Sequence, residues 1–354
     1  MRLLFITQVL DRNDPILGFT VRWIEGLARL TDRVRVIALE VGDTEGLGDN
    51  VDWRVVGRQG RIKRYLLFRR HLKEAFDDGF GHVLTHMVPR YSLVAAGPAR
   101  RARARHFMWY THAGVDGRLR RAVQKVECVF TASSESLGLD PSNKVVTGHG
   151  IDLVPFPRMP LPTKGPRVLL SAGRLTPSKD PKTILQALAL LLEEGRDVCL
   201  EWAGGALAQG DPAFGAEVHN LVESLGLEQR VRFLGPVQPS SMPEIYQRSS
   251  LFLSASRTGS VDKVVLEAMA SGRGIVTSNP SFPPLLTSLG AERSGRHVFE
   301  EGNPVELAAK TGALLDLDPG EHEMLGDDLR GIIERDHEVD ALMARLVERM
   351  GAPL

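Results

Sequence analysis

The chain has 354 residues, of which 43% are hydrophobic and 25% are charged. This is an ordinary globular composition, and the chain is too long for one typical compact core, so two domains are expected. The two cysteines, Cys128 and Cys199, lie inside apolar runs typical of buried strands, which excludes a disulfide framework and favours a reducing, cytoplasmic setting. The N-terminus lacks the cleavage site of a signal peptide, and no stretch approaches ~20 apolar residues, so a soluble chain with at most peripheral membrane contact is expected.

The formal net charge is zero, but the charges are distributed unevenly. Residues 1–155 contain 24 Lys and Arg against 17 Asp and Glu, whereas the remainder contains 20 against 27. This asymmetry favours an anionic partner for the first half and a charge-compensated site in the second half. Evolutionary drift of a solvated surface explains it equally well.

The first half begins with a β-run, a loop containing a glycine and a helical pattern. The run LLFITQVL, residues 3–10, is followed by Gly18 and by helical spacing over residues 20–30. Further β-runs alternate with helical patterns at residues 34–41, 82–88, 105–112, 128–133 and 144–148. Such alternation is typical of a doubly wound, mainly parallel sheet with right-handed crossovers.

The segment VPFPRMPLPTKGP, residues 154–166, separates the two halves. Its five prolines forbid a continuous helix or a central strand, which predicts a stiff linker at the domain boundary. The second half repeats the opening layout with RVLLSAG, residues 167–173, and a helical pattern over residues 176–195. Its other β-runs lie at residues 198–205, 231–235, 251–256 and 274–278.

The expected fold class is therefore α/β, with two Rossmann-like domains that have mainly parallel sheets. The domains are predicted over residues 1–155 and 156–335, followed by a C-terminal segment over residues 336–354. An amphipathic helix is expected within that segment at residues 337–350, because apolar residues recur at helical spacing. These residues are Val339, Leu342, Met343, Leu346 and Met350.

Ligands of such sheets bind beyond the carboxyl ends of the strands, which directs attention to the residues after each β-run. The segment GRLTPSKD places Arg174 and Lys179 around a Ser-Pro turn directly after the strand at residues 167–173. Two cations in this position can neutralise a diphosphate without a metal. The alternative is a pair of ordinary surface cations near the start of a helix.

A second cluster lies at residues 254–276, where a β-run ends in a Thr-Gly-Ser loop and a helix is predicted to begin at about Val261 or Asp262. The backbone N–H groups and the positive dipole end of that helix predict an anion site. In the alternative interpretation, Asp262 simply caps the helix.

Glu267 lies on the same predicted helix between apolar residues, where an unpaired carboxylate would cost several kcal/mol. A ribose diol would supply two hydrogen-bond donors to it. The alternative is a salt bridge to a neighbouring Lys or Arg.

Three histidines follow β-runs: His86, His112 and His149. Each is also compatible with a hydrogen-bonded core position, and this interpretation is favoured for His86 and His149. Neither histidine nor cysteine spacing matches a metal site, so no structural zinc is predicted. Asp316 and Asp318 imitate an Asp-x-Asp metal motif, but a turn that ends a helix explains them better.

Other motifs are missing from the sequence. It contains no G-x-x-x-x-G-K-[ST] and no G-x-G-x-x-G after a strand, which disfavours a P-loop NTPase and an ordinary dehydrogenase. It also contains no G-x-S-x-G nucleophile elbow.

At these residues the sequence resembles the retaining glycosyltransferases of family 4, also called group 1, which have the GT-B architecture. The resemblance extends over nearly the whole chain, through residues 10–28, 173–180, 231–256 and 265–272. It implies that Gly173, Arg174 and Lys179 bind the donor diphosphate and that Glu267 binds the donor ribose. It further implies that Phe233 and Leu234, in the V-x-F-x-G phrase, lie in a loop facing the nucleotide base.

In the first half, the resemblance implies that Gly18 lies in a flexible loop that lets the backbone approach the donor. His112 resembles the histidine that faces the reacting sugar, and the C-terminal helix is implied to return to the N-terminal domain. The N-terminal domain would bind the acceptor, with His86 and His149 on its acceptor side, and the C-terminal domain would bind the nucleotide sugar across a cleft.

One departure from the family pattern concerns its signature of two glutamates separated by seven residues. The first glutamate falls on Gly259, and the usual Glu-Gly-Phe-Gly loop is replaced by Gly-Ser-Val-Asp. Two explanations remain: Ser260 or Asp262 recognises the sugar in a variant subgroup, which we favour, or the enzyme is inactive.

The expected function is metal-independent transfer of a sugar, with retention, from a nucleotide-diphosphate sugar to an acceptor hydroxyl. Neither a cofactor nor a metal is expected, nor a nucleic-acid partner. The acceptor would be a glycan, a lipid-linked molecule or a small molecule. The alternatives are a nucleotide-sugar 2-epimerase and a catalytically inactive nucleotide-sugar-binding protein.

The segment RIKRYLLFRRHLK, residues 61–73, is basic and partly amphipathic. Ile62, Tyr65, Leu66 and Leu72 lie near one side of a helix drawn through it. The segment is a candidate for contact with an anionic acceptor or with an anionic membrane at its inner face. Ordinary core packing with a solvated basic face is at least as well favoured.

Overall fold

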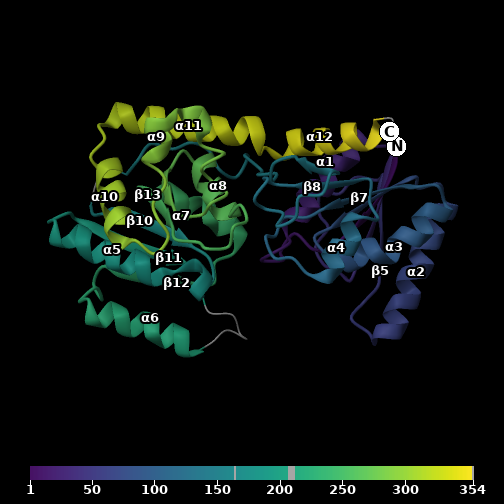
Figure 1. Cartoon of the computed structure of the whole chain (residues 1–354), viewed down its shortest axis with the longest axis horizontal. Coiled ribbons are helices and arrows are strands. Elements are labelled where there is room, and N and C mark those ends of the chain that lie inside the picture. The colour runs from purple at the N-terminus through teal and green to yellow at the C-terminus, as the bar shows by residue number, and fades with distance from the viewer. Residues whose placement is uncertain (163–164, 206–211, 353–354) are drawn as a thin grey trace. The chain divides into compact units, whose positions relative to one another are not determined.

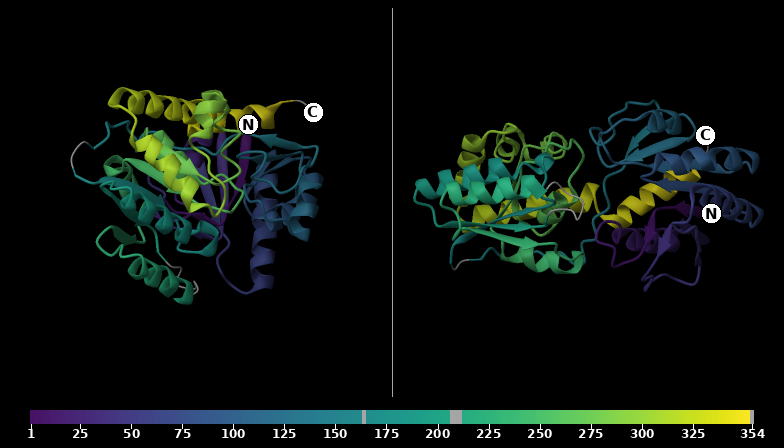
Figure 2. Two further views of the ribbon diagram at one scale, coloured as in Figure 1. Left: turned by 60° about the vertical axis from the view of Figure 1, so that its left-hand side comes forward. Right: turned by 90° about the horizontal axis from the view of Figure 1, so that it is seen from below.

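The computed structural model describes residues 1–162, 165–205 and 212–352 of the chain. It divides the chain into two compact units, which we call the N-terminal unit, Met1–Asp152 with Asp336–Leu354, and the C-terminal unit, Leu153–Arg335. Each unit contains one large parallel β-sheet with helices packed against it (Figures 1 and 2). Among the described residues, no helix combines the length and the apolar character that crossing a membrane requires.

The N-terminal unit has a seven-stranded sheet in the order β5-β3-β1-β6-β7-β8-β9, and every neighbouring pair is parallel. Strand β1 forms because its residues after Arg2 are a continuous apolar run, and all four are buried, as in a strand covered on both faces. The strands are β1 (Arg2–Ile6), β3 (Arg33–Ala38), β5 (Val51–Val55), β6 (His82–His86), β7 (Arg105–Trp109), β8 (Cys128–Thr131) and β9 (Lys144–Val146), and a short pair is formed by β2 (Val9–Leu10) and β4 (Glu40–Val41).

The helices of the N-terminal unit are α1 (Phe19–Leu30), α2 (Arg61–Asp77), α3 (Pro89–Arg101), α4 (Gly117–Val123) and α12 (Val339–Gly351). Helix α12 packs against α1 although the two are more than 300 residues apart in sequence. The five apolar residues of its predicted stripe are all buried. Arg22 of α1 donates two hydrogen bonds to the Asp340 carboxylate at 2.7 and 2.9 Å, which fixes the orientation of the two helices.

The C-terminal unit has a five-stranded parallel sheet in the order β12-β11-β10-β13-β14. Its strands are β10 (Arg167–Ala172), β11 (Val198–Ala203), β12 (Val231–Gly235), β13 (Leu251–Ser254) and β14 (Gly274–Thr277). Its helices are η1 (Pro177–Lys179), α5 (Pro181–Glu193), α6 (Pro212–Ser224), η2 (Pro239–Ser241), α7 (Met242–Arg248), α8 (Lys263–Ala270), η3 (Thr287–Leu289), α9 (Ala291–Gly295), α10 (Pro304–Leu315) and α11 (Pro319–Asp336).

The structure differs from the sequence-based expectation at several elements. The run at residues 3–10 divides into β1 and β2, and the helical pattern at residues 176–195 divides into η1 and α5, because Asp180 between them has a φ of 42°. Strand β5 was not predicted, since its residues alternate in burial at the edge of the sheet. The described part of the proline-rich segment has neither helix nor strand, and residues 163–164 of that prediction lie outside the described residues.

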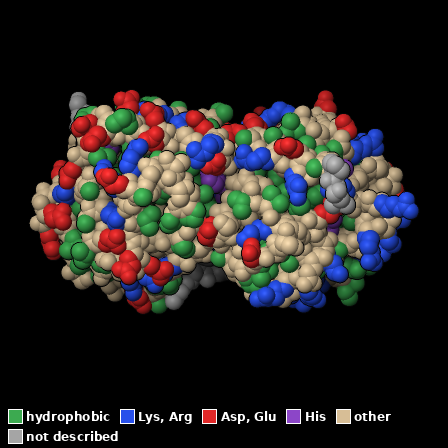
Figure 3. All heavy atoms as spheres, turned by 45° about the horizontal axis from the view of Figure 1, so that its top comes forward, with side chains coloured by type: hydrophobic (Ala, Val, Ile, Leu, Met, Phe, Trp, Pro, Cys, Tyr) green, Lys and Arg blue, Asp and Glu red, His purple; other side chains and the backbone are tan. Residues whose placement is uncertain are grey.

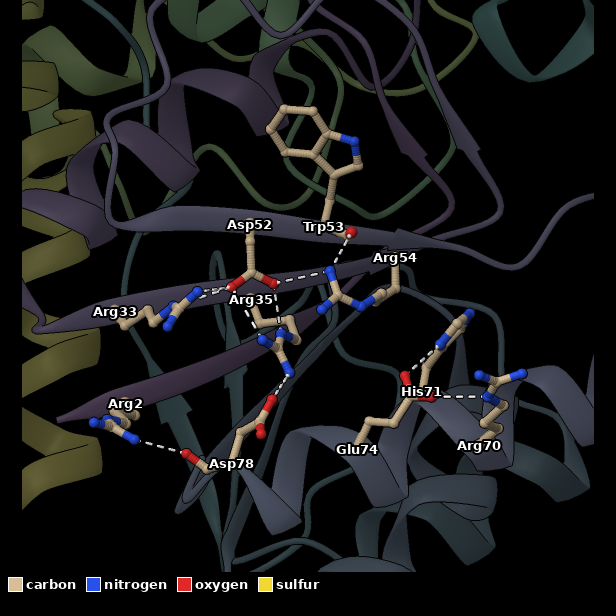
Figure 4. A network of polar contacts seen from close by, with 10 residues as sticks. All are labelled: Arg2, Arg33, Arg35, Asp52, Trp53, Arg54, Arg70, His71, Glu74 and Asp78. Atoms are coloured by element: carbon tan, nitrogen blue, oxygen red, sulfur yellow. Dashed lines mark hydrogen bonds and ion pairs between the residues drawn. The ribbon is translucent and has the colours of Figure 1, made fainter.

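A network of charged side chains covers one end of the N-terminal sheet (Figure 4). Arg35 of β3 is only 3% exposed and donates to Asp52 of β5 at 2.5 and 3.1 Å and to Asp78 at 2.5 Å. Its guanidinium also lies 4.7 Å from the centre of the Phe80 ring. The buried charge is therefore compensated on every side, and the network ties β3 and β5 to the end of α2.

Two buried histidines of the N-terminal unit predict a loss of stability in acid. Burial lowers the pKa of His86 to about 3 and that of His106 to about 4, from an ordinary 6.5. The unfolded chain therefore binds protons below pH 6.5 that the folded chain does not, so the free energy of unfolding falls from pH 6.5 toward those lower values. Each of the two histidines is expected to lower the free energy of unfolding at pH 5 by about 2 kcal/mol relative to pH 7.

Urea unfolding of the wild type and of His106→Phe at pH 7 and pH 5 checks this expectation. Among the described residues, neither ring nitrogen of His106 has a hydrogen-bond partner, so the variant removes the titration without breaking a bond. Between the two pH values the free energy of unfolding of the variant should fall by about 2 kcal/mol less than that of the wild type. Replacement of the exposed His219 by Asn is the control and should leave the loss unchanged. Equal losses in His106→Phe and the wild type would contradict the expectation.

Candidate functional site

The loops that follow the strands of the C-terminal sheet meet at its carboxyl edge, which is where ligands of such sheets bind. Residues 173–180 follow β10, residues 255–262 follow β13, and residues 278–281 follow β14. Hydrogen bonds connect all three loops. The sequence predicted two separate clusters, one around Lys179 and one around Asp262. The structure brings both to the same edge of the sheet.

The loop after β10 carries Arg174 and Lys179. Gly173 has a φ of 137°, and a Cβ there would lie 3.3 Å from Cε of Lys179, so the lysine side chain folds back over this glycine. The Gly173 carbonyl accepts a hydrogen bond of 2.9 Å from the Trp202 indole of β11, which fixes the turn. Arg174 is exposed and has no acidic partner within the described ranges. It is therefore a cation available to a ligand.

Lys179 and Asp262 form an ion pair between the two loops. The lysine Nζ lies 2.5 Å from Oδ1 of Asp262 and 3.3 Å from the Ser256 hydroxyl. Both side chains are mostly buried, with 17% and 11% of their surfaces exposed. Asn279, which is fully buried, donates to the other oxygen of Asp262 at 3.3 Å. The lysine is thus positioned in advance by its contacts, with its charge already compensated.

Asp262 precedes α8 but its side chain makes no capping hydrogen bond to that helix. The interpretation of Asp262 as a simple helix cap is therefore wrong, because the carboxylate is turned toward Lys179. The loop before it is held by the 279–281 segment: Asn279 donates to the Ser260 carbonyl at 2.7 Å, and Ser281 donates to the Gly259 carbonyl at 2.5 Å. Val261 is buried and anchors the loop beside the positive end of the α8 dipole.

Gly259 occupies the position of the first signature glutamate and has a φ of 69°. This left-handed conformation favours glycine over any residue with a Cβ, at a cost of roughly 1–2 kcal/mol. A glutamate at this position would be strained, so the glycine fits the conformation of this loop, and position 259 offers no side chain to a ligand.

Glu267 of α8 is 6% exposed, and two protein side chains satisfy its carboxylate. Lys263, one turn earlier, donates to Oε1 at 2.6 Å, and the Tyr246 hydroxyl lies 3.0 Å from Oε2. Burial and the neighbouring carboxylate raise the pKa of Tyr246 well above its ordinary value, so the hydroxyl keeps its proton and donates. The structure thus has the salt bridge that was the alternative to a ribose contact.

The V-x-F-x-G phrase forms β12 at the edge of the sheet. Phe233 is half-buried, and its ring lies 4.7 Å from that of His219 on α6, edge to face. Leu234 is also half-buried, and Gly235 ends the strand with a φ of 69°. The Gly204 N–H donates to the Gly235 carbonyl at 2.8 Å, which brings the loops after β11 and β12 together.

In the N-terminal unit, His112 lies on the loop after β7 and is exposed. Its Nδ1 accepts a hydrogen bond of 2.9 Å from the Gly114 N–H. Because Nδ1 is the acceptor, the neutral ring carries its proton on Nε2, which is then a donor for a ligand hydroxyl.

His86 and His149 are placed differently. His86 is 1% exposed and packs against Phe5, Trp23 and Trp109, with Nδ1 only 3.3 Å from the Thr7 hydroxyl. His149 is 6% exposed, and its backbone N–H donates to Nδ1 of His337 at 3.1 Å. Both positions correspond to the core interpretation and not to an exposed acceptor surface.

Gly18 is the N-cap residue directly before α1, and its φ of −55° is an ordinary helical value. A Cβ at this position would lie 2.5 Å from the Arg12 carbonyl oxygen and 2.7 Å from that of Asp14. The glycine is therefore required by the close packing of its own loop, a constraint that no local pattern of residues indicates.

The basic segment at residues 61–73 forms most of α2. The core side of this helix consists of Phe68, Leu72 and Ala75. Ile62 and Leu66, which the sequence pattern grouped with Leu72, are instead 78% and 61% exposed. The helix thus presents apolar and cationic side chains together to the solvent.

Asp316 ends α10 and pairs with Arg196 at 2.7 Å, and Asp318 accepts a hydrogen bond from the Glu321 backbone at 2.8 Å at the start of α11. The interpretation of the Asp-x-Asp pattern as a helix-ending turn agrees with these contacts. The part of the chain that the structure describes contains no group of three or more His, Cys, Asp or Glu side chains able to hold a metal ion.

Several residues of the site were not found from the sequence. Asn279, Ser281 and Tyr246 belong to elements distant in sequence from the residues they contact, and no local pattern marks them. Lys263 could have been found, because a lysine four residues before a glutamate on a helix is a standard ion pair.

The comparisons with known proteins agree with this geometry. A family model described as glycosyl transferases group 1 matches residues 157–341, slightly more than half of the chain. Spore coat protein SA of Bacillus subtilis is 34% identical over 161 residues, and the D-inositol 3-phosphate glycosyltransferase of Corynebacterium diphtheriae is 31% identical over 195 residues. These matches cover 45% and 54% of the chain but only 42% of each relative, so the chain spans less than half the length of the relatives it matches.

Solved structures resemble the whole chain. The HepE protein of Anabaena, solved in complex with UDP and glucose, has a TM-score of 0.78 at 19% identity, with 100% of both chains covered. A glycosyltransferase from Rickettsia africae has a TM-score of 0.77 at 14% identity, covering 99% of this chain and 98% of its own. At these identities the likeness establishes the fold, and the predicted GT-B fold class is confirmed.

Proposed function

The chain belongs to the glycosyl transferases of group 1, and we propose on this basis that it transfers a sugar from a nucleotide-diphosphate sugar to an acceptor hydroxyl. The C-terminal unit would bind the donor and the N-terminal unit the acceptor. The observation that carries this proposal is the convergence of Arg174, Lys179 and the start of α8 at one edge of the C-terminal sheet. The loop after β10 and the start of α8 thus bring positive groups to this edge from two separate parts of the chain.

This arrangement suits departure of a nucleoside diphosphate. The bond between the sugar C1 and the phosphate oxygen breaks, a bond from C1 to the acceptor oxygen forms, and the acceptor proton moves to the leaving phosphate oxygen. Negative charge grows on the diphosphate, so cations fixed beforehand act mainly in the transition state. Arg174 would hold the phosphates through its planar fork and Lys179 as a point charge, which supplies the charge that a metal provides elsewhere.

Attack from the face that the diphosphate leaves would retain the anomeric configuration, as in family 4. His112, with its proton on Nε2, would donate to a hydroxyl of the reacting sugar. Gly18 would let its loop approach the donor. Phe233 and Leu234 would lie beside the base, and Glu267 would accept from the ribose hydroxyls through lone pairs that Lys263 and Tyr246 leave free.

Recognition of the sugar is assigned to Ser260 and Asp262, because Gly259 has no side chain to perform it. Asp262 would exchange its contact with Lys179 for sugar hydroxyls once the diphosphate neutralises the lysine. The exposed basic surface of α2 supports peripheral contact with an anionic membrane.

Thermal unfolding in the presence of UDP-glucose and other nucleotide sugars tests the proposal, and UDP-glucose comes first because HepE was also solved with it. A bound donor at about 100 times its Kd should stabilise the folded state by ~2.7 kcal/mol. EDTA should leave this stabilisation unchanged, and NMR of the product should show the donor's anomeric configuration.

Three other results would change the assignment. If no nucleotide sugar and no free UDP raises the melting temperature, the donor site is elsewhere. Conversion of the bound donor to a second nucleotide sugar without any acceptor would identify an epimerase. Binding with neither transfer nor hydrolysis, across a panel of acceptors, would identify an inactive binding protein.

A further inference from the structure

The N-terminal unit contains a pocket of about 230 Å³ that the proposed donor chemistry does not use. Residues directly after four strands line it: Gln8 after β1, Leu39 after β3, Val56 after β5 and Val88 after β6. These strands are consecutive neighbours in the sheet, in the order β5-β3-β1-β6. The chain winds outward from β1 to β3 and β5 and then resumes at β6 on the other side. The pocket therefore lies at the switch point of the sheet, where ligands of doubly wound folds bind.

Three arginines line the same pocket, Arg61 and Arg64 from the first turns of α2 and Arg90 from the first turn of α3. The lining includes no Asp or Glu. None of the three guanidiniums has an ion pair or a side-chain hydrogen bond within the described ranges. Glu40, beside Leu39 in the chain, pairs with Arg58 instead. Three uncompensated cations in one pocket repel one another, and an anion relieves that repulsion.

The rest of the lining is aromatic and apolar. Tyr91 and Phe68 stack with their ring centres 5.7 Å apart, and Tyr65 and Val94 complete this wall. Burial raises the pKa of Tyr91 to about 12, against the opposing effect of the charges on Arg64 and Arg90. Its hydroxyl therefore keeps its proton near neutral pH and is a further donor for an anion.

The backbone that shapes this pocket is strained at one residue. Met87, between β6 and α3, has a φ of 61°, which is uncommon for a residue with a side chain. The turn at Met87 places Val88 in the pocket and lets Pro89 begin α3, which fixes the position of Arg90. Strain of this kind concentrates at ligand sites.

We propose that this pocket, the Arg61–Arg64–Arg90 pocket, binds a phosphoryl group of the acceptor, so that the acceptor is a phosphorylated molecule. Three guanidinium groups match the three terminal oxygens and the double charge of a phosphate monoester better than the two oxygens of a carboxylate. The aromatic wall would cover the carbon part of the molecule. The volume is below the roughly 300–1,000 Å³ of pockets for drug-sized ligands, which suits a small head group.

The inference rests on the proposed transferase function, since it assigns the acceptor. The phosphoryl group could belong to a soluble phosphate ester or to a lipid head group. Ile62 and Leu66 lie exposed on the first turns of α2, next to the arginines in sequence, where they could enter a lipid surface. In Figure 3, Lys and Arg side chains gather at the end of the N-terminal unit on the right.

Binding experiments on the full chain test the inference. The probes are inorganic phosphate, sn-glycerol 3-phosphate, and phosphatidylcholine vesicles with and without phosphatidic acid. Calorimetry and co-sedimentation would compare the wild type with Arg64→Gln/Arg90→Gln and with Lys63→Gln/Lys73→Gln. The two double variants lose the same charge, but Lys63 and Lys73 are exposed residues of α2 outside the pocket. The pocket variant should lose at least tenfold in affinity, and the control variant less than threefold.

The probe that binds distinguishes the two sources. Binding of the soluble phosphates that depends on Arg64 and Arg90 supports a soluble acceptor, whereas such binding of phosphatidic acid vesicles alone supports a lipid. Equal losses in both double variants would mean general surface electrostatics and overturn the inference, as would no binding of any probe.

Two controls separate this inference from the proposed function. The melting temperature without ligand should stay within about 2 °C of wild type in both variants. If the pocket variant melts lower, the single variant Arg90→Gln replaces it, because Arg90 is exposed. Stabilisation by UDP-glucose should be unchanged in the pocket variant. If the pocket binds phosphate but no sugar is ever transferred, the proposed function fails while the site stands. If sugar is transferred but the pocket binds no phosphate, the site alone is rejected.

Discussion

Replacement of Arg174 by Ala is expected to lower the rate of sugar transfer by about 30- to 1,000-fold. Arg174 is exposed on the loop after β10, and no acidic side chain in the described ranges competes for it. Charge-assisted hydrogen bonds to a leaving diphosphate are worth roughly 2–4 kcal/mol in the transition state. With ~1.4 kcal/mol for each factor of ten, that range gives the expected loss.

Matched variants make the Arg174 result specific. Lys at position 174 should restore only part of the rate, because a point charge lacks the fork of the guanidinium. Lys182→Ala, at a half-buried residue of α5 that pairs with Glu217, should transfer at the wild-type rate. Melting without ligand should be unchanged in all three variants. A normally folded Arg174→Ala variant with wild-type transfer would place the diphosphate elsewhere.

Replacement of Lys179 by Ala is expected to have a still larger effect, about 100- to 3,000-fold on transfer. The substitution removes a cation and also leaves Asp262, 11% exposed, without its ion-pair partner. The carboxylate would then repel the incoming diphosphate in a partly buried site, and together these effects cost roughly 3–5 kcal/mol.

The pairing of Lys179 with Asp262 predicts a rescue. In the Lys179→Ala background, Asp262→Asn removes the repulsion, while the amide side chain can still hydrogen-bond Asn279 and the sugar hydroxyls assigned to position 262. About tenfold of the lost rate should therefore return. Steady-state transfer rates of the two single variants and the double variant form the required cycle. A double variant as slow as Lys179→Ala would show that the Asp262 charge has no influence on the donor.

The sequence alone determined the fold class and the principal donor-site candidates. Alternating β-runs and helical patterns give two parallel sheets because the periods of 2 and 3.6 residues are set by the backbone. Arg174, Lys179 and Asp262 could be named because functional residues follow strands, and the carboxyl ends of parallel strands share one edge. Glu267 could be named because a carboxylate between apolar residues on a helix needs a partner, and Phe233 was named from a family motif, which is also a local property of the chain.

Only the tertiary structure decided how these residues are paired. Asp262 as a cap and Asp262 as the partner of Lys179 are equally compatible with the sequence, because the two residues are 83 positions apart. The roles of Asn279 and Tyr246 depend likewise on contacts between distant elements. Edge strand β5 was missed because one face of it is solvated and its apolar run is interrupted.

The exposed side of α2 shows the same limit. Helical spacing groups Ile62 and Leu66 with Leu72, yet the structure buries Leu72 and exposes the other two. The spacing of apolar residues predicts the direction of each side chain around the helix axis. It does not predict which turns of the helix lie against the sheet and which extend beyond it. The core ends at Phe68, and the first two turns extend beyond it. Which apolar residues are covered is therefore decided by the surroundings of the helix, and these exist only once distant strands have assembled.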